Sequence, residues 1–279
     1  MERIVLIALL LASSLSWGQS YKDKSKEIGI VGGTAYYLGE INRQHFGGEL
    51  ALGGGVFFRY NHDRRWSFNF GVNYMEVSAY DSDSPDAWNR NRNLHFKSPI
   101  IEGSGIVELN FFPYQPGSKQ DFFSPYLFTG ITYYQMNPQA EFNGQWYELQ
   151  PLGTEGQGTS AGEATYNLNG LALQYGFGFK LNITGRLACS ASYGMRSTST
   201  DYLDDVSTNY ADPNLLALER GFLTQEFSDR SFEGIGVGNG NGGVQRGDPT
   251  NNDFYAFTTF ALSLRIDKKA TSCWGGGKF

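Results

Sequence analysis

The fold is decided by the stretch LALQYGFGFKLNI, which runs from Leu171 to Ile183. Every second side chain in it is large and apolar or aromatic, whereas the side chains between them are small or polar, such as Gln174 and Lys180. This alternation with a period of two continues over 13 residues and predicts a β-strand with one apolar face and one polar face. The length suits a tilted strand that crosses a bilayer, for which ~9–11 residues are needed.

The same alternation recurs along the chain, most clearly after Trp66, Leu187 and Phe254. Helical patterning is limited to Asn214–Arg220, where one or two turns are expected within a loop. The alternating segments predict eight strands, at 27–38, 49–61, 66–80, 96–112, 124–137, 168–183, 186–200 and 252–266.

The connections between these strands alternate in length. Short turns are expected at 61–65, 113–123 and 182–185, and longer loops near 39–48, 81–95, 138–167 and 201–251. Short turns on one rim, long loops on the other and an even number of strands are typical of outer-membrane barrels, which keep both termini in the periplasm.

We therefore predict an all-β fold, an eight-stranded antiparallel transmembrane outer-membrane β-barrel with long extracellular loops, over residues 19–266. A soluble barrel of the lipocalin type is the alternative, because it shows the same alternation with its apolar face turned inward. Charges and glycines on the polar face favour the membrane barrel, since small polar side chains fit a narrow lumen.

The N-terminus has the pattern of a secretory signal peptide over residues 1–18. Arg3 precedes an unbroken apolar stretch, Ile4–Ala12, and small residues around Trp17 predict cleavage before Gln19. The stretch is too short for a transmembrane helix, and no later segment reaches about 18 consecutive apolar residues. A membrane location is therefore expected only through strands, in the outer-membrane lipid.

The polar face carries charges that a lipid-facing position would make costly. Eight strands leave room in the interior only for side chains, so these charges are expected to pair across a closed lumen, which argues against a porin. A proton or ion relay is the alternative reading of the same residues. The expected lumen network consists of Glu49, Arg59, Glu102, Glu108, Lys180, Arg196 and Arg265.

No group of residues predicts catalysis, a cofactor or a small-molecule substrate. The three histidines, His45, His62 and His95, lie in or near turns and loops without a paired motif. No metal site is predicted either, although the segment TDYLDD offers candidate calcium ligands whose spacing differs from that of an EF-hand. These candidates are Asp201, Asp204 and Asp205. The net charge of −6 gives no sign of a nucleic-acid partner.

Residues 267–279 follow the last strand and are expected to form a periplasmic tail. The tail is either a frayed end or a partner-binding arm, in which Lys268, Lys269, Cys273 and Trp274 would make the contacts. An oxidising periplasm allows Cys273 to pair with Cys189, whereas the expected lipid-facing direction of Cys189 argues against a disulfide. The sequence leaves both questions open.

Six segments resemble the PorG-like outer-membrane proteins of Bacteroidetes, and the loop segments are the most specific. These segments are EIGIVGGTAYYLGEIN (27–42), IIEGSGIVELNFFPY (100–114), SPYLFTGITYYQMNPQA (124–140), WYELQPLGTEGQG (146–158), RSTSTDYLDDVSTNYADP (196–213) and RGDPTNNDFYAF (246–257).

The resemblance implies a non-enzymatic component of the type IX secretion system, which exports cargo and, in gliding species, adhesins. It implies that the barrel anchors a periplasmic ring of PorK-like lipoprotein and PorN-like subunits to the outer membrane. The family also includes paralogues whose role is unassigned. A small surface barrel that acts as an adhesin or interaction protein through its long loops is the alternative function.

Overall fold

The computed structural model describes residues 24–43, 49–160, 162, 164–232 and 241–267. Within them, eight long antiparallel strands lie within two residues of the predicted bounds at either end, so the predicted strands are confirmed. The strands are β1 (Ser25–Leu38), β2 (Ala51–Asn61), β3 (Trp66–Tyr80), β4 (His95–Asn110), β5 (Phe123–Met136), β8 (Asn169–Asn182), β9 (Leu187–Thr198) and β10 (Phe254–Arg265).

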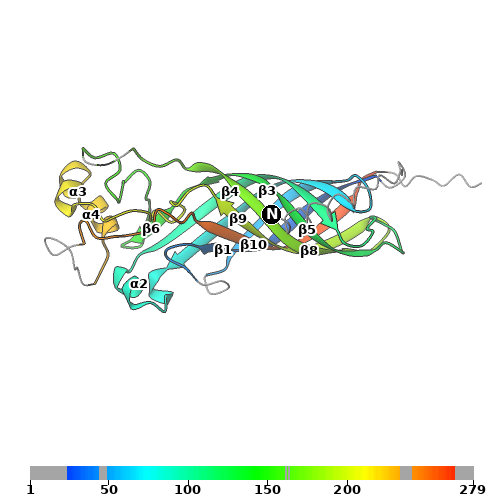
Figure 1. The fold of residues 1–279 in the computed structure, drawn as a ribbon, viewed down its shortest axis with the longest axis horizontal. Helices are drawn as coiled ribbons and strands as arrows, with labels where there is room; N and C mark the ends of the chain where they lie inside the picture. Colours follow the sequence, from blue (N-terminus) through cyan, green and yellow to red (C-terminus); the bar gives the residue numbers. More distant parts are fainter. Residues whose placement is uncertain (1–23, 44–48, 161, 163, 233–240, 268–279) are drawn as a thin grey trace, which may run out of the picture.

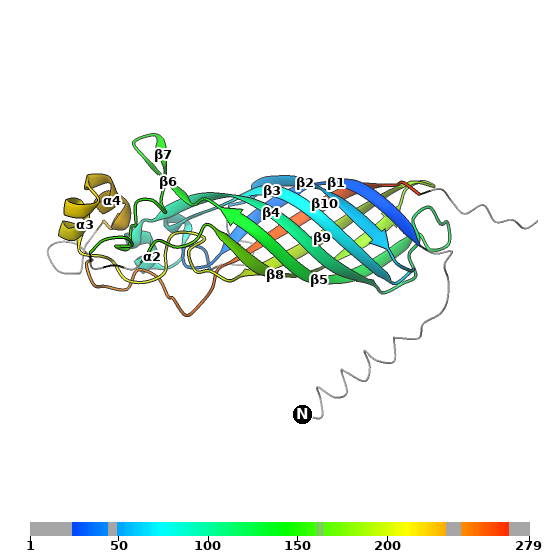
Figure 2. The same cartoon turned by 90° about the horizontal axis from the view of Figure 1, so that it is seen from above.

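These strands close into a barrel, seen from two directions in Figures 1 and 2. Neighbours along the chain pair antiparallel, and the first strand pairs with the last over the whole length from Glu27 with Arg265 to Leu38 with Phe254. Because the wall has no open edge, its backbone hydrogen bonds are made within the barrel, as a segment that crosses a bilayer requires.

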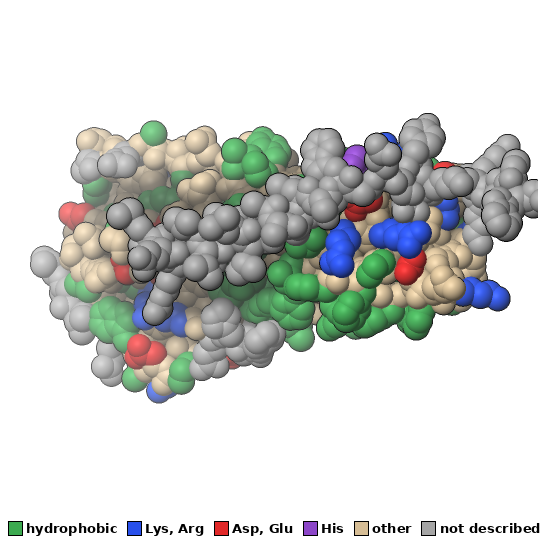
Figure 3. All heavy atoms as spheres, turned by 45° about the vertical axis from the view of Figure 1, so that its right-hand side comes forward, with side chains coloured by type: hydrophobic (Ala, Val, Ile, Leu, Met, Phe, Trp, Pro, Cys, Tyr) green, Lys and Arg blue, Asp and Glu red, His purple; other side chains and the backbone are tan. Residues whose placement is uncertain are grey.

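The outer face of the barrel is apolar. Ile30, Val56 and Val72 lie side by side on β1, β2 and β3, and their side chains are 62%, 57% and 58% exposed. Figure 3 shows hydrophobic side chains gathered on the wall and Lys and Arg side chains towards its right-hand end. The inner face instead carries buried charges such as Glu102 and Glu108. The lipocalin-type alternative, with apolar residues inside and polar residues outside, is therefore wrong.

The two ends of the barrel differ as predicted. Short turns at 62–65, 111–122 and 183–186 define what we call the short-turn end, and longer segments define the long-loop end. The long segments contain η2 (Asp81–Asp83), α2 (Ala87–Arg92), a hairpin of β6 (Gln139–Phe142) and β7 (Gln145–Glu148), α3 (Pro213–Glu219) and α4 (Phe222–Ser228). Together with the described residues that connect them, these elements form the loop cap.

Local sequence explains two of the cap helices. The side chain of Asp212 accepts a hydrogen bond from the backbone N–H of Asn214, and Pro213 occupies the first turn of α3. Asp86 caps α2 in the same way through the N–H of Trp88. The predicted helix at 214–220 is confirmed as α3, which begins and ends one residue earlier.

The interior at the long-loop end is apolar rather than charged. Inward-facing Met75, Phe96 and Ile100 pack there with Leu203 and Val206, which come from the loop between β9 and β10. These side chains are at most 1% exposed. The cap therefore seals this end of the barrel with a hydrophobic cluster above the charged lumen.

Among the described helices, none combines the length and the apolar character needed to cross a bilayer. The predicted signal peptide, 1–18, and the tail residues Lys268, Lys269, Cys273 and Trp274 lie outside the described residues.

Candidate functional site

The half of the lumen nearer the short-turn end is organised around Glu108. Its carboxylate lies 2.6 Å from Nζ of Lys180 and 2.9 Å from Nε of Arg59, and it accepts a third hydrogen bond from Asn69 at 2.9 Å. Lys180 also lies 4.6 Å from the centre of the Tyr126 ring. Glu108 and Lys180 are fully buried. A buried charge needs such partners, because leaving it unpaired costs several kcal/mol, about 3–5 for a broken pair.

A second ion pair lies nearer the long-loop end. Nη2 of Arg196 is 2.7 Å from Glu102 Oε1, and the hydroxyl of Tyr255 donates to Glu102 Oε2 at 2.8 Å. Asn73 donates a further hydrogen bond to the same carboxylate at 2.9 Å. The two acids therefore hold two separate polar layers in the interior.

Between these layers the lumen contains a cavity of about 70 Å³, lined by Arg59, Glu108, Gln174 and Arg196 among others. A space of this size holds only a few water molecules. The interior is thus filled by side chains from wall to wall rather than open along its axis.

Six of the seven residues expected in the lumen network are buried in the interior, and the exception is Glu49. Among the six, Arg265 lies at the short-turn end, where it pairs with Asp267 at 2.6 Å and donates to the carbonyl of Pro116. Glu49 is the correction: it is exposed and lies before the first residue of β2, where it accepts a hydrogen bond from Ser78. Since the strand begins two residues later than predicted, the alternation does not extend to Glu49.

A charged residue in the described part of the lumen, Glu27, was not among the predicted ones. Glu27 is fully buried, accepts from Asn61 at 2.7 Å and lies 3.8 Å from Arg59. Its position between outward-facing Ile28 and the start of the strand was the available signal, because Ile28 and Ile30 fix the inward parity of Glu27.

The histidines and cysteines are dispersed. His62 lies in the turn before β3, and His95 begins β4, stacked on Tyr80 at 5.5 Å between ring centres. Cys189 lies opposite Leu181 and Leu262, two exposed residues, so it shares the outer face of the barrel. His45 and Cys273 lie outside the described residues.

Two buried arginines connect all four long loops. Arg92 forms a two-pronged ion pair with Asp81, 2.7 Å at each contact, and donates to the backbone carbonyls of Arg246 and Glu40. Arg246 in turn pairs with Glu155 at 2.9 Å. Each of these four loops therefore supplies at least one partner to a continuous network beneath the surface of the cap.

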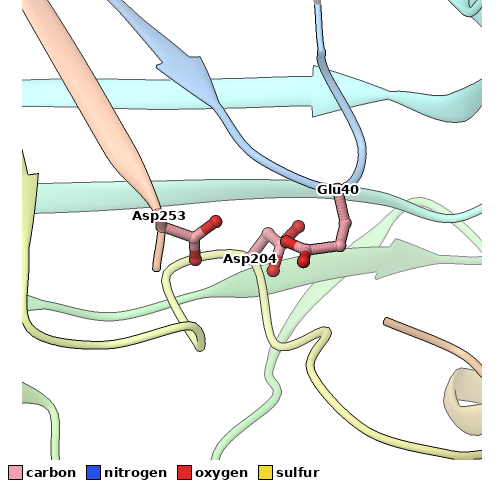
Figure 4. Close-up of side chains that lie close together, drawn as sticks. All are labelled: Glu40, Asp204 and Asp253. Carbon is pink, nitrogen blue, oxygen red and sulfur yellow. The ribbon is translucent and has the colours of Figure 1, made fainter. Parts of the chain in front are cut away.

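Three further carboxylates converge where the cap meets the barrel, and we call Glu40, Asp204 and Asp253 the carboxylate cluster. One oxygen of each lies within 4.8 Å of one oxygen of each of the others, and the side chains are at most 5% exposed. Figure 4 shows the three carboxylates turned towards one another from the loop after β1, the loop after β9 and the residue before β10. Among the described residues, no Lys, Arg or His lies within ion-pair distance of them.

Hydrogen bonds orient these carboxylates. Backbone N–H groups of Val206 and Leu203 donate to Asp204 Oδ1 and Asp253 Oδ2, both at 2.9 Å. The hydroxyl oxygen of Tyr37 lies 2.6 Å from Asp204 Oδ2 and 2.6 Å from Asp253 Oδ1. Glu40 Oε2 has no hydrogen-bond partner.

The electrostatic consequence is a group of carboxyls that ionise with difficulty. Burial and the nearby Asp201 raise the pKa of Glu40 to about 7. Burial, followed by the charge of Glu40, raises the pKa of Asp204 well above its usual range, and burial with the charge of Asp204 does the same for Asp253. The chemistry of this site is therefore that of hard oxygen ligands held close together without a counter-charge.

The structure divides the three candidate calcium ligands of TDYLDD between different sites. Asp204 belongs to the carboxylate cluster, and Asp201 lies beside it with both carboxylate oxygens buried and without hydrogen-bond partners. Asp205 has a positive φ of 66°, points elsewhere, and accepts from Tyr166 at 2.7 Å and from Thr154. Glu40 follows the predicted first strand, 27–38, whereas Asp253 was predicted inside the last strand, 252–266. In the structure both flank the long-loop ends of the paired strands β1 and β10.

A family model described as a domain of unknown function, DUF6089, matches residues 3–237. The chain belongs to the DUF6089 family. The match includes β1 to β9 and most of the loop cap, so both polar layers of the lumen lie largely within the family region of this DUF6089 protein. No curated protein sequence matches it.

Three solved structures are similar to this DUF6089 protein. Neisserial surface protein A is 11% identical with a TM-score of 0.41, over 87% of this chain and 99% of that one. The outer membrane protein OprG of Pseudomonas aeruginosa is 9% identical with a TM-score of 0.40, over 87% and 98%. The attachment invasion locus protein Ail of Yersinia pestis is 10% identical with a TM-score of 0.38, over 87% and 97%. At these identities the likeness concerns the fold.

Proposed function

We propose that this DUF6089 protein is a non-enzymatic outer-membrane barrel that anchors the periplasmic ring of a type IX secretion system. The observation that carries the proposal is the filled lumen: Glu108, Lys180 and Arg59 occupy the half nearer the short-turn end, and the apolar cluster closes the long-loop end. A barrel closed in this way offers its two ends, rather than a passage, for function. The resemblance of its loop segments to PorG-like proteins supports the choice of secretion system.

The outer face supports the membrane location within this proposal. Exposed apolar side chains lie on seven of the eight wall strands, all except β9, and include Ile30, Leu127, Phe177 and Leu262. Monomeric soluble proteins rarely expose a continuous apolar surface of this kind, whereas a lipid bilayer covers it.

The short-turn end would then face the periplasm and the ring. Four exposed cations gather on its turns: Arg64 and Arg65 between β2 and β3, Lys119 between β4 and β5, and Arg186 between β8 and β9. Asp121 pairs with Arg64 at 3.1 Å, so part of this charge is balanced locally. The remaining positive surface suits an acidic face on a PorK-like or PorN-like partner.

The system-level test is deletion of the gene followed by measurement of type IX cargo in the culture medium. We expect export to stop and to return with the wild-type gene. Normal export in the deletion strain would contradict the proposal, because an anchor of the ring is needed for every cargo protein.

The contact-level test is charge reversal at the short-turn end. We expect Arg65→Glu with Arg186→Glu to reduce co-purification of the ring subunits at unchanged barrel level in the membrane. Arg90→Glu, an exposed arginine on α2 at the opposite end, is the matched control and should leave co-purification unchanged. A chain that ends at Asp267 keeps the pair with Arg265 and tests the tail with Lys268, Lys269, Cys273 and Trp274.

A second candidate function is supported by the regular elements of the loop cap and the apolar side chains that they expose. Its β6–β7 hairpin and helices α3 and α4 project from the barrel in Figure 2, and they expose Trp146, Leu218 and Phe222. Exposed apolar residues on ordered loops are typical of binding surfaces, which fits an adhesin or interaction protein. Loss of surface binding after replacement of the 139–148 hairpin by a short turn, with export intact, would favour this function over ring anchoring.

A further inference from the structure

We propose that Glu40, Asp204 and Asp253 bind a calcium ion between the loop cap and the barrel. Oxygens bound to one Ca²⁺ lie 2.3–2.6 Å from it, so no two of them are separated by more than about 5 Å. The three carboxylate oxygens meet this limit, since all lie within 4.8 Å of one another.

Buried carboxylate oxygens without hydrogen-bond donors lie at this site. Glu40 is 5% exposed and its Oε2 has no hydrogen-bond partner, although the same side chain receives a long bond on Oε1 from the N–H of Asp248, at 3.4 Å. Figure 4 shows the Glu40 carboxylate directed at that of Asp204. Asp201 adds two further buried oxygens without partners next to the cluster. A buried carboxylate oxygen without a donor costs free energy that a bound cation would recover.

Proton counting supports the same conclusion. A tyrosine hydroxyl has one proton to donate, yet the Tyr37 oxygen lies 2.6 Å from both Asp204 and Asp253 and also accepts from the N–H of Glu40 at 3.0 Å. When both aspartates are ionised, one of the two close oxygen pairs has no proton between them. A calcium ion removes this repulsion by attracting both carboxylates at once.

The nearest arginine does not supply the missing positive charge. The guanidinium of Arg92 donates to Asp81 and to two backbone carbonyls, including that of Glu40, and not to the Glu40 carboxylate. The cluster therefore combines three buried acids with fixed orientation and no cation from the protein within ion-pair distance among the described residues.

A surface groove lined by Glu40, Arg43, Asp248 and Asn251, among others, lies next to the cluster, and in this proposal it is the entry route. Calcium takes 6–8 oxygen ligands in a flexible arrangement, so water that enters by this groove completes a coordination shell that the carboxylates begin.

The direct test uses terbium, a luminescent substitute for calcium, on the full-length barrel purified in detergent and stripped with EDTA. Tyrosine excitation should give a saturable terbium signal with one equivalent, because Tyr37 touches two of the proposed ligands. Calcium should displace terbium, and millimolar magnesium should not, since Mg²⁺ demands a smaller and more regular site. We expect Glu40→Gln and Asp204→Asn each to weaken calcium binding by ~10–100-fold or more, the range that loss of even an outer partner produces.

Asp83→Asn is the matched control, because Asp83 is an exposed carboxylate on η2 in the same cap. It should bind terbium and calcium like the wild type. Absence of a saturable signal, or equal calcium affinity in Glu40→Gln and the wild type, would overturn the proposal.

A second measurement covers the case in which a variant folds poorly. The thermal midpoint of the wild type should rise with calcium concentration, as ligand linkage requires. Glu40→Gln removes one negative charge from the cluster, so it should be more stable than the wild type in EDTA and less stable in saturating calcium. The same order of stability in both conditions would show that the cluster shares protons instead of binding a cation, and would overturn the proposal.

Discussion

Glu108 pairs with two cations in the barrel interior, and this shared position decides how substitutions there should behave. Arg59 and Lys180 both contact its carboxylate, at 2.9 and 2.6 Å. Arg59 has a second acid nearby, Glu27 at 3.8 Å, whereas Lys180 has only the amide oxygen of Asn110 as its other hydrogen-bond acceptor. Loss of the acid therefore affects more partners than loss of the lysine.

We expect Glu108→Gln to lower the free energy of unfolding by about 3–5 kcal/mol, because buried Lys180 loses its counter-charge and Arg59 is left with the more distant Glu27. Lys180→Met should cost less, about 1–3 kcal/mol, since Glu108 keeps Arg59 and Asn69. Urea titrations of the barrel refolded in phospholipid vesicles measure both values. Glu141→Gln, an exposed acid on β6, should change stability by less than about 0.5 kcal/mol. A larger loss for Lys180→Met than for Glu108→Gln would refute this account.

The sequence predicted charged residues of the lumen where the alternation was unbroken, as for Glu102 and Lys180. It failed where a strand boundary was uncertain by two residues, as for Glu49, because the parity of a side chain has no meaning outside the strand. The carboxylate cluster was only partly accessible. Asp204 stood out within TDYLDD, but its partners Glu40 and Asp253 lie 164 and 49 residues away along the chain, and only the closure of β1 on β10 brings them together.

The outward-facing residues of the eight wall strands define the surface that lipid would cover. Val56 lies near the middle of β2, between Ile30 on β1 and Val72 on β3, in the centre of the exposed apolar face. Leu218 on α3 is even more exposed, at 84%, but it belongs to the loop cap. Exposure alone does not show which of the two side chains would face lipid. The position of Val56 on a wall strand and of Leu218 on a cap helix does.

We therefore predict that Val56→Arg destabilises the barrel in phospholipid vesicles by about 2–4 kcal/mol, the cost of an arginine near the bilayer midplane. Leu218→Arg should change the free energy of unfolding by less than about 0.5 kcal/mol, because its side chain stays in water. Equal effects of the two substitutions would mean that the wall around Val56 does not face lipid.

Periodicity predicted the strands because each is 11–16 residues long and has two contrasting faces. It predicted α3, where apolar residues follow an N-cap aspartate and a proline, but not α2, α4 or the β6–β7 hairpin. The missed elements are four to seven residues long and have no apolar run like that of α3. Their formation depends on the buried contacts of the cap, such as the packing of Phe227 on Tyr147.

The whole molecule is a closed barrel whose interior side chains change from polar to apolar along the barrel axis. Glu108 and Glu102 organise two polar layers, and an apolar cluster that includes Phe96 and Leu203 lies towards the long-loop end. The alternation of the strands predicted a closed, charged lumen but not the apolar layer. Leu203 and Val206 in that layer depend on how the loop between β9 and β10 folds back over the barrel, which no strand pattern encodes.

A filled interior predicts that the protein does not conduct ions. After insertion into a planar bilayer, we expect the membrane current to stay at the level of the protein-free bilayer at moderate voltages. Stable channel openings from a homogeneous preparation would contradict the closed lumen and would revive the interpretation of Glu102 and Arg196 as part of an ion relay.

The arginine network of the cap has a consequence for the order of assembly. Arg92 contacts the carbonyl of Arg246, which lies 154 residues later, and Arg246 pairs back to Glu155. These contacts cannot form until the final hairpin, β9 and β10, has been delivered to the same side of the membrane as the earlier loops. The cap should therefore be completed last, after insertion, and its buried ion pairs would have to break before any hairpin could be pulled back through the bilayer. The loops would in this way make insertion kinetically irreversible.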